Sequence, residues 1–234
     1  MNFLKLYQKI DDSLTYLWSS VCNEKKLLRK NIKKKEILLV DIGANVGNYV
    51  EFVNKNFTIK TLYCFEPQAE LVKNLEEISY VKNMHIFPYA LSNLEKIKRF
   101  YTYHVSSQSS FYKNVKGFDA LQKIKKTQYI KTKVFDNIFN KNQTIDLCKI
   151  DAEGEDFNIL KGMKKNLKKG NIKLLKIEMN FLNMRSGINY TYLDVLNFLK
   201  KFNYNLISVS KIKYKNNELF LIDAFFKKII NKST

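Results

Sequence analysis

The sequence contains little proline and glycine, with two prolines and seven glycines among 234 residues. Long flexible linkers and low-complexity tracts are rich in these residues, so neither is expected here. The length fits one domain of ordinary size with a terminal extension. Hydrophobic residues make up 45% of the chain, which is ample for a buried core.

Cysteine is also scarce. The three cysteines, Cys22, Cys64 and Cys148, are an odd number without paired spacing, which argues against a disulfide framework or a zinc site. Cys64 and Cys148 lie within apolar, strand-like runs, where we expect them to be small buried hydrophobes. A reducing compartment fits this cysteine usage best.

Long hydrophobic runs are missing as well. No stretch approaches the roughly 18 continuous apolar residues of a membrane span, so we expect no transmembrane segment. The first residues meet Lys5 before any apolar stretch forms, so no signal peptide is predicted. These absences together predict a cytoplasmic protein.

Negative charge is in short supply, since 22 acidic residues face 41 basic ones and the formal net charge is +19. A field of this sign attracts polyanions such as RNA, DNA, phosphorylated glycans or anionic lipid. However, the only arginines are Arg29, Arg99 and Arg185, and nucleic-acid sites favour arginine over lysine. Solvated surface lysine and a polyanion partner, RNA or an anionic surface, therefore both stay open.

The hydrophobic spacing alternates between that of strands and that of helices. Short apolar runs predict strands over 37–42, 61–65, 85–91, 129–135, 146–150, 174–179, 204–209 and 219–226. Helical spacing predicts helices over 3–21, 48–57, 67–78, 118–126, 157–163 and 192–202. We expect a surface connection over 23–36 and a hairpin or loop near 96–113. The repeated strand–helix order predicts a doubly wound α/β fold with a mostly parallel sheet. Its last two strands are joined by a link too short for a crossover helix, so they should pair antiparallel.

The most informative stretch is VDIGANVGNY, residues 40–49. A buried strand ends in an acid, Asp41, and turns into a helix through Gly43 and Gly47. Gly43 permits a tight turn and a close ligand approach, and Gly47 lets the helix begin against the strand. The pattern is not a dinucleotide fingerprint, because Asp41 would repel a pyrophosphate, but it suits a ligand that carries an ammonium and a sulfonium. A tight strand–helix turn without any ligand is the alternative.

A second acid, Glu66, follows the next strand, 19 positions after Gly47. An acid at this place can accept hydrogen bonds from both hydroxyls of a ribose. Pro67 should start the following helix and fix the direction of Glu66. The third strand ends near Ala90 and Leu91 and should pass an adenine.

The blocks DIGANVGNY, CFEP, YALS, KTKVFDNIF, IDLCKIDAEGEDFNILKGM and LLKIEMN together resemble the FkbM family of methyltransferases. The resemblance covers roughly residues 37–180 and is most specific in KIDAEG, residues 149–154. It implies a class I methyltransferase fold with a seven-stranded sheet, S-adenosylmethionine as methyl donor, and usually a hydroxyl acceptor on a sugar, glycolipid, polysaccharide or polyketide. It divides the chain into an N-terminal helical extension, 1–30, and an FkbM-type domain, 31–234.

The resemblance, together with the motifs above, assigns roles to particular residues. The residues expected to contact the cofactor are Asp41, Gly43, Ala44, Asn45, Gly47, Asn48, Tyr49, Glu66, Pro67, Ala90, Leu91 and Asp151. Glu153 is expected at the edge of the active site. Residues 92–135 match the family poorly apart from the serine-rich segment 106–110, so the identity of the acceptor stays open.

Methyl transfer to a sugar hydroxyl needs alignment of two reactants and removal of a proton. Asp151 could accept that proton, or could bind a divalent ion together with Glu153 that lowers the pKa of the hydroxyl. His104, near the serine-rich segment, could act as the base if its loop folds over the site. The two acids could also be helix-start residues, and His104 a surface residue.

Two other functions stay open beside an O-methyltransferase. The positive charge favours an RNA methyltransferase, while the few arginines and the absence of an N/D-P-P-Y/F block oppose it. A non-catalytic binding module of the same fold would have lost its cofactor, which the intact Asp41, Gly43, Glu66 and Asp151 oppose.

Overall fold

The computed structural model describes residues 23–115, 123–140, 142–182 and 185–229. The helix predicted over 3–21 and most of the helix predicted over 118–126 lie outside these residues. None of the described helices is long and apolar enough to cross a membrane.

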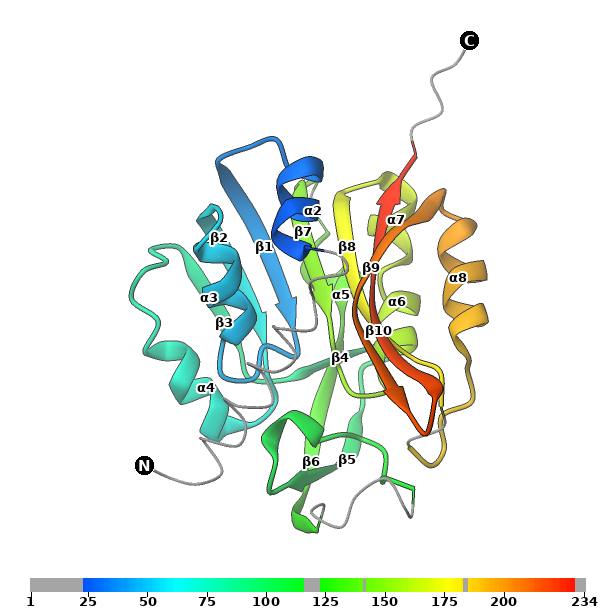
Figure 1. Cartoon of the computed structure of the whole chain (residues 1–234). Coiled ribbons are helices and arrows are strands. Elements are labelled where there is room, and N and C mark those ends of the chain that lie inside the picture. Colours follow the sequence, from blue (N-terminus) through cyan, green and yellow to red (C-terminus); the bar gives the residue numbers. More distant parts are fainter. Residues whose placement is uncertain (1–22, 116–122, 141, 183–184, 230–234) are drawn as a thin grey trace.

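Seven strands form the main sheet, in the spatial order β3-β2-β1-β7-β8-β10-β9 (Figure 1). Their bounds are β1 (Glu36–Ile42), β2 (Thr58–Phe65), β3 (Met84–Phe87), β7 (Ile145–Ile150), β8 (Ile172–Asn180), β9 (Tyr204–Lys215) and β10 (Glu218–Lys228). The first five pair in parallel, and β10 runs antiparallel to both β8 and β9. The predicted doubly wound sheet and its antiparallel C-terminal hairpin are thus confirmed.

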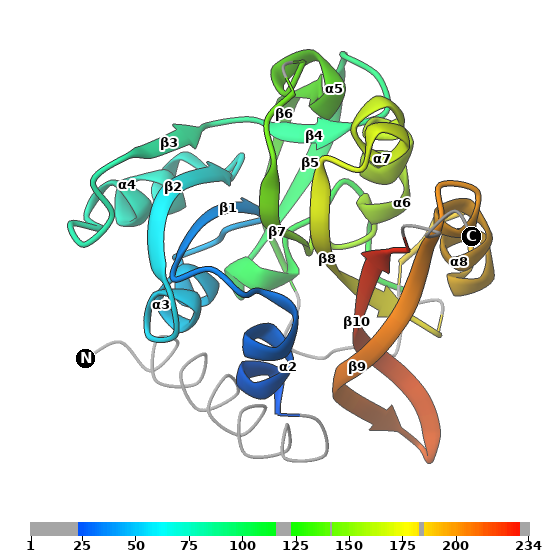
Figure 2. The same ribbon diagram turned by 90° about the horizontal axis from the view of Figure 1, so that it is seen from above.

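Helices cover both faces of the sheet (Figure 2). One face carries α2 (Glu24–Asn31), α3 (Asn48–Asn54) and α4 (Ala69–Glu76). The other face carries α5 (Phe135–Ile138), α6 (Asp156–Lys161), α7 (Lys164–Lys169) and α8 (Tyr192–Lys200). This arrangement follows from right-handed crossovers between parallel strands, which place successive helices on alternate faces when the direction of strand addition reverses.

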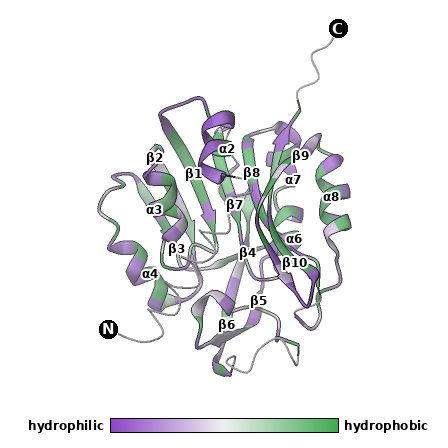
Figure 3. Cartoon of the chain, in the orientation of Figure 1, coloured by the Kyte–Doolittle hydropathy of each residue, from purple (hydrophilic) through white to green (hydrophobic). Residues whose placement is uncertain are grey.

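The core consists of two hydrophobic layers, one on each face of the sheet. Along β1, Leu39 points into the layer under α2 and α3, while Val40 and Ile42 point into the opposite layer. Figure 3 shows hydrophobic residues along the central strands and hydrophilic ones on the outer faces of the helices. Strands buried on both sides explain why the predicted runs are continuously apolar instead of alternating.

A smaller sheet lies beside the carboxyl ends of the central strands (Figure 1). It has the order β4-β6-β5, with β4 (Ala90–Ser92) parallel and β5 (Ile97–Tyr103) antiparallel to β6 (Ile124–Val134). The single strand predicted over 85–91 is therefore wrong, because the chain leaves the main sheet after Phe87 and enters the small one at Ala90. Residues 124–126, predicted to be helical, are part of β6; their neighbours on β5 supply the hydrogen bonds that a short helix would lack.

The segment 23–36 differs from the predicted surface connection. Residues Glu24–Asn31 form α2, which Asn23 caps by accepting a hydrogen bond from the backbone N–H of Lys26 at 3.1 Å. Leu28 is fully buried in the layer that contains Leu39 and Val50. Only a few apolar residues anchor this helix, so its helical spacing is difficult to detect among the many basic residues of the segment.

Three charged residues lie in register across the buried centre of the sheet. Asp41 of β1 pairs with Lys149 of β7, which in turn pairs with Lys176 of β8. Side chains at matching positions of parallel strands point to the same face, so one acidic and two basic side chains form a row near the carboxyl edge of the sheet. This row positions the candidate site.

Candidate functional site

Asp41 and Lys149 form a buried ion pair at the end of β1. The Lys149 Nζ donates to Asp41 Oδ1 at 3.0 Å and to the Gly43 carbonyl at 3.1 Å, and it lies 3.6 Å from Asp151 Oδ2. Burial would lower the pKa of Lys149, but the carboxylates of Asp41 and Asp151 outweigh it and raise the pKa, so the ammonium stays charged. Asp41 itself is fully buried.

The loop from Gly43 to Gly47 lies directly against the end of β7. A side chain at Gly43 would place its Cβ 1.9 Å from the backbone oxygen of Asp151, and the φ of Gly43 is +75°. Only glycine fits such a contact. Asn45 also adopts a positive φ, 52°, which asparagine tolerates better than most residues. The loop and the Asp151 segment are therefore one packed unit.

Glu66 at the end of β2 holds this loop from the other side. Its carboxylate accepts hydrogen bonds from the backbone N–H of Asn45 at 2.9 Å and from that of Gln68 at 3.0 Å. Burial raises the pKa of Glu66, and these hydrogen bonds oppose the increase. Pro67 does not start the helix as predicted, because Gln68 is the N-cap and α4 begins at Ala69.

Other predicted cofactor residues have structural partners. The N–H of Ala44 donates to the Phe65 carbonyl at 3.2 Å, and Asn48 opens α3. The Tyr49 hydroxyl donates to Glu24 of α2 at 2.9 Å, while the Lys176 ammonium lies 4.3 Å from the centroid of the Tyr49 ring. The buried Ala90 and Leu91 lie in β4, outside the main sheet.

Three carboxylates meet where β7 and β8 end. Oxygens of Asp151, Glu153 and Glu178 lie within 4.8 Å of one another. Each carboxylate also has a cationic partner: Lys149 is 3.6 Å from Asp151, Lys211 is 3.2 Å from Glu178, and Arg185 pairs with Glu153. The geometry can hold a divalent cation, but the three basic side chains already balance the charge.

The cluster contains groups whose ionisation is pushed in opposite directions. Burial would raise the pKa of Asp151, but Lys149, Lys211 and Lys176 outweigh it and lower the pKa. Burial and the nearby Asp151 carboxylate raise the pKa of Glu178 well above its usual range. The pKa values of these two neighbouring carboxyl groups are thus pushed apart, a separation typical of acid–base pairs at active sites.

The backbone at Glu153 is strained. Its φ is 51°, a conformation that costs energy in a residue with a side chain. The Ser110 hydroxyl donates to the Glu153 carbonyl at 2.6 Å, and Asp156 accepts from the N–H groups of Ala152 and Gly154 at 2.9 and 3.0 Å. These contacts hold the strained turn in place.

The serine-rich segment lies across both halves of the site. Ser106 donates to the Asn45 side chain at 3.4 Å, Gln68 donates to the Ser106 carbonyl at 3.4 Å, and Ser110 reaches Glu153. His104 is exposed at the end of β5. The segment does fold over the site, while the role predicted for His104 stays a prediction.

Sequence reasoning missed six residues of this site: Glu24, Lys176, Glu178, Arg185, Lys211 and Asp223. It also gave Lys149 no role. Lys149 and Glu178 carry a detectable signal, because a charged residue inside an apolar, doubly buried strand must be paired. Glu24, Arg185 and Lys211 come from surface-like sequence, so their positions depend on tertiary packing.

Comparison with known proteins agrees with this geometry. Residues 41–206 match the methyltransferase FkbM domain, while comparison with curated proteins finds no match. A methyltransferase from Clostridium acetobutylicum described as S-adenosylmethionine-dependent shares the fold with a TM-score of 0.52 and 14% identity, over 97% of this chain and 99% of that one. Magnesium protoporphyrin IX methyltransferase from Synechocystis does so with a TM-score of 0.52 and 9% identity, over 98% and 85%.

These structural similarities concern the fold, since the identities are low. The family match shows more than the fold, because it spans most of the chain and includes the Gly43–Gly47 loop, Glu66 and the carboxylate cluster. The chain belongs to the FkbM family of methyltransferases and has the class I methyltransferase fold.

Proposed function

We propose that this protein transfers a methyl group from S-adenosylmethionine to a hydroxyl of a carbohydrate, glycolipid or related metabolite. The observation that carries the proposal is the contact between the Gly43 loop and Asp151, bridged by Lys149. It joins the loop that suits a nucleoside ligand to an ionised carboxylate in a single unit. A transferase needs this proximity, since it must align donor and acceptor.

The residues around this unit suit S-adenosylmethionine. Six acids and four bases form the charged groups here: Glu24, Asp41, Asp151, Glu153, Glu178 and Asp223 against Lys149, Lys176, Lys211 and Arg185. A local excess of acid in a chain with net charge +19 favours a cationic ligand. In addition, Asp41 Oδ2 is buried without a hydrogen-bond partner among the described residues.

In this proposal Glu66 and the Gly43–Gly47 loop hold the nucleoside. The Glu66 Oε1 accepts both hydrogen bonds from Gln68, and it can accept hydrogen bonds from ribose hydroxyls in their place. When bound, S-adenosylmethionine supplies a methyl group already activated on a sulfonium. The protein's task is then to orient the acceptor hydroxyl and take its proton.

Asp151 is the group proposed to accept that proton. Its lowered pKa keeps it ionised at neutral pH, and Lys149 fixes its position relative to the loop. Arg185 and Ser110 hold the neighbouring Glu153 turn, which shapes the space in front of Asp151.

Transfer of labelled methyl groups into fractionated glycans, lipids and RNA of the source cell tests the proposal. We expect label in a glycan or lipid fraction with the wild-type protein. Asp151→Asn should lower turnover about 100-fold or more, the usual contribution of a general base, and should leave the affinity for S-adenosylhomocysteine close to wild type. Label confined to RNA would refute the proposed acceptor. Normal turnover of Asp151→Asn would refute the proposed role of Asp151 as proton acceptor.

Removal of divalent ions decides between the two roles open to Asp151. The basic partners of all three carboxylates favour direct proton transfer over a bound ion. We therefore expect turnover to persist after EDTA treatment and dialysis. Loss of turnover that Mg²⁺ or Mn²⁺ restores would instead show that an ion works at the carboxylate cluster.

A further inference from the structure

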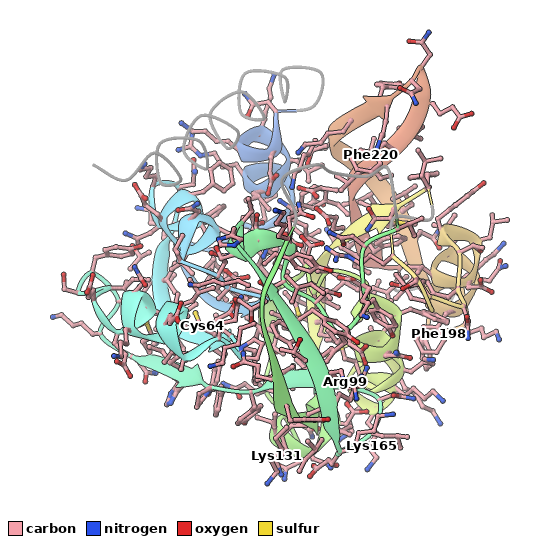
Figure 4. All side chains as sticks on the ribbon, turned by 90° about the horizontal axis from the view of Figure 1, so that it is seen from below. Cys64, Arg99, Lys131, Lys165, Phe198 and Phe220 are labelled. Atoms are coloured by element: carbon pink, nitrogen blue, oxygen red, sulfur yellow. The ribbon has the colours of Figure 1, made fainter. Side chains whose placement is uncertain are left out.

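The small sheet presents one face to solvent. Residues alternate along its strands, and the outward set pairs across them: Ile97 with Lys131, Arg99 with Tyr129, and Tyr101 with Thr127. These six residues are called the β5–β6 outer face here. Ile97 and Tyr129 are 71% and 67% exposed. Figure 4, which views the molecule from the side of this sheet, shows Arg99 and Lys131 on it.

The opposite face of the same strands is packed. Lys98 forms an ion pair with Glu155 at 2.6 Å, and the rings of Phe100 and Phe111 meet edge to face at 5.2 Å. The large apolar and aromatic side chains of the outer face are therefore not needed for the core. Exposed apolar groups gathered in one place mark interaction surfaces.

The outer face is basic as well as aromatic. Arg99 and Lys131 lie on this face, and β5 and β6 contain no acidic residue. Among the other lysines of the two strands, Lys98 pairs with Glu155 on the packed face, and Lys125 and Lys133 pair with Glu70 and Glu95. The hydroxyls of Tyr129 and Tyr101 interact with the Arg99 guanidinium and raise its pKa, and the Lys113 ammonium lies 5.4 Å from the centroid of the Tyr101 ring. This surface combines cationic groups with tyrosine rings, which complements an anionic, ring-containing polymer.

The outer face is directly connected to the candidate active site. Tyr101 and Ser110 exchange two backbone hydrogen bonds, at 2.7 and 3.0 Å, and the Ser110 hydroxyl reaches the carbonyl of Glu153. Ser110 therefore links the strand that carries Tyr101 and Arg99 to the turn that holds Glu153.

We propose that the β5–β6 outer face docks an anionic polysaccharide, the acceptor whose hydroxyl is methylated. Lysine provides point charges that suit scattered carboxylates or sulfates, whereas nucleic-acid readers rely on forked arginine contacts. Arg99 is the only arginine of the two strands, while β6 carries Lys125, Lys126, Lys131 and Lys133. Tyrosine offers sugar rings an apolar face together with a polar tip. The use of the bound polymer as acceptor rests on the proposed function, while its binding does not.

Binding of labelled polygalacturonate oligomers to the full chain tests this surface. We expect binding that weakens as salt increases and is absent for neutral dextran oligomers of equal length. The variant Arg99→Ala/Tyr129→Ala should bind about tenfold more weakly, the loss expected from one aromatic contact and one ionic contact. Tyr214→Ala, which removes a tyrosine 63% exposed on the β9–β10 hairpin, is the matched control and should bind normally.

Three results would overturn the proposal. They are equal affinity of wild type and the double variant, tighter binding of a single-stranded oligouridylate than of polygalacturonate, and tighter binding to phosphatidylglycerol vesicles. Binding of S-adenosylhomocysteine is measured in the same samples. If that ligand fails to bind while polygalacturonate binding still depends on Arg99 and Tyr129, only the proposed function fails.

Discussion

Lys149 is the residue on which the geometry of the candidate site most depends. It is 7% exposed and contacts Asp41, Gly43 and Asp151, which belong to two neighbouring strands and the loop between sheet and helix. A buried ion pair of this kind contributes little net stability compared with apolar side chains, but removing one partner is costly. Its value here is that it fixes the loop relative to Asp151.

Lys149→Met should therefore destabilise the protein by about 3–5 kcal/mol, because the buried Asp41 carboxyl loses its cationic partner. Urea unfolding followed by circular dichroism measures the change. Asp41→Asn/Lys149→Met, which removes both charges, should recover much of the loss. Equal stability of the single and double variants would show that the pair is not coupled.

The raised pKa of Asp156 should make the stability of the protein depend on pH. Burial raises its pKa to about 7, although backbone N–H groups of Ala152 and Gly154 oppose the increase. The folded protein then binds a proton between the unfolded pKa, near 3.9, and about pH 7, where the unfolded chain does not. The free energy of unfolding should accordingly fall as pH rises, by about 2 kcal/mol from pH 5 to pH 7.

Urea unfolding at pH 5, 6 and 7 checks this expectation. The comparison with Asp156→Asn isolates this carboxyl, because burial also raises the pKa of Glu66 and Glu178. Asp156→Asn should flatten the pH dependence. A wild-type protein whose stability is constant, or rises, over these values would show that the N–H groups dominate and that Asp156 is ionised throughout.

At the scale of elements, α2 differs most from the prediction, which placed a surface connection in this segment. Leu28 is buried between this helix and the main sheet, and Glu24 reaches Lys176 at 3.0 Å and Tyr49 at 2.9 Å. The helix thus closes the row of charges that begins at Asp41. The boundary predicted at residue 30 separates this helix from the domain that it packs against.

Leu28→Ala should destabilise the whole domain by about 2–5 kcal/mol, the range for a large-to-small change in a core. Lys25→Ala, an exposed change on the same helix, is the control and should have almost no effect. Thermal unfolding of both variants gives the comparison. A normal melting temperature for Leu28→Ala would mean that α2 is an independent appendage.

The elements that could be predicted are those whose burial leaves a continuous apolar run. β1, β7 and β8 are buried on both faces, and their sequences ILLVDI, IDLCKI and LLKIEM show it directly. The glycine turn after β1 was predictable for the same reason, because a steric requirement acts locally. β5 and β6 are partly exposed, so the alternation of apolar and polar residues along them is weak. The chain passes from the main sheet to the small sheet before Ala90, and no local sequence pattern marks this change.

The site residues at strand ends could be predicted from the sequence, whereas their long-range partners could not. Asp41, Glu66 and Asp151 stand at strand ends, where doubly wound sheets bind ligands. Arg185 and Lys211 reach the cluster from a loop and from a bulge with φ 46° in β9, so only the folded chain brings them there. Long-range ion pairs have no spacing rule in the sequence.

At the scale of the whole molecule, charge is unevenly distributed. The chain carries +19, yet the candidate site contains more acids than bases, while β5 and β6 are entirely basic among their charged residues. This division suits two ligands of opposite charge, a cationic donor in the acidic site and an anionic acceptor on the basic sheet.

The central claim is that the Gly43–Gly47 loop, Glu66 and Asp151 surround one nucleoside-amino-acid ligand. A crystal structure of the full chain with S-adenosylhomocysteine tests it most directly. The account predicts the ribose hydroxyls on the Glu66 carboxylate, with the sulfur and the amino-acid end between the loop and Asp151. Density for the ligand elsewhere, or none beside a well-ordered Glu66, would contradict it.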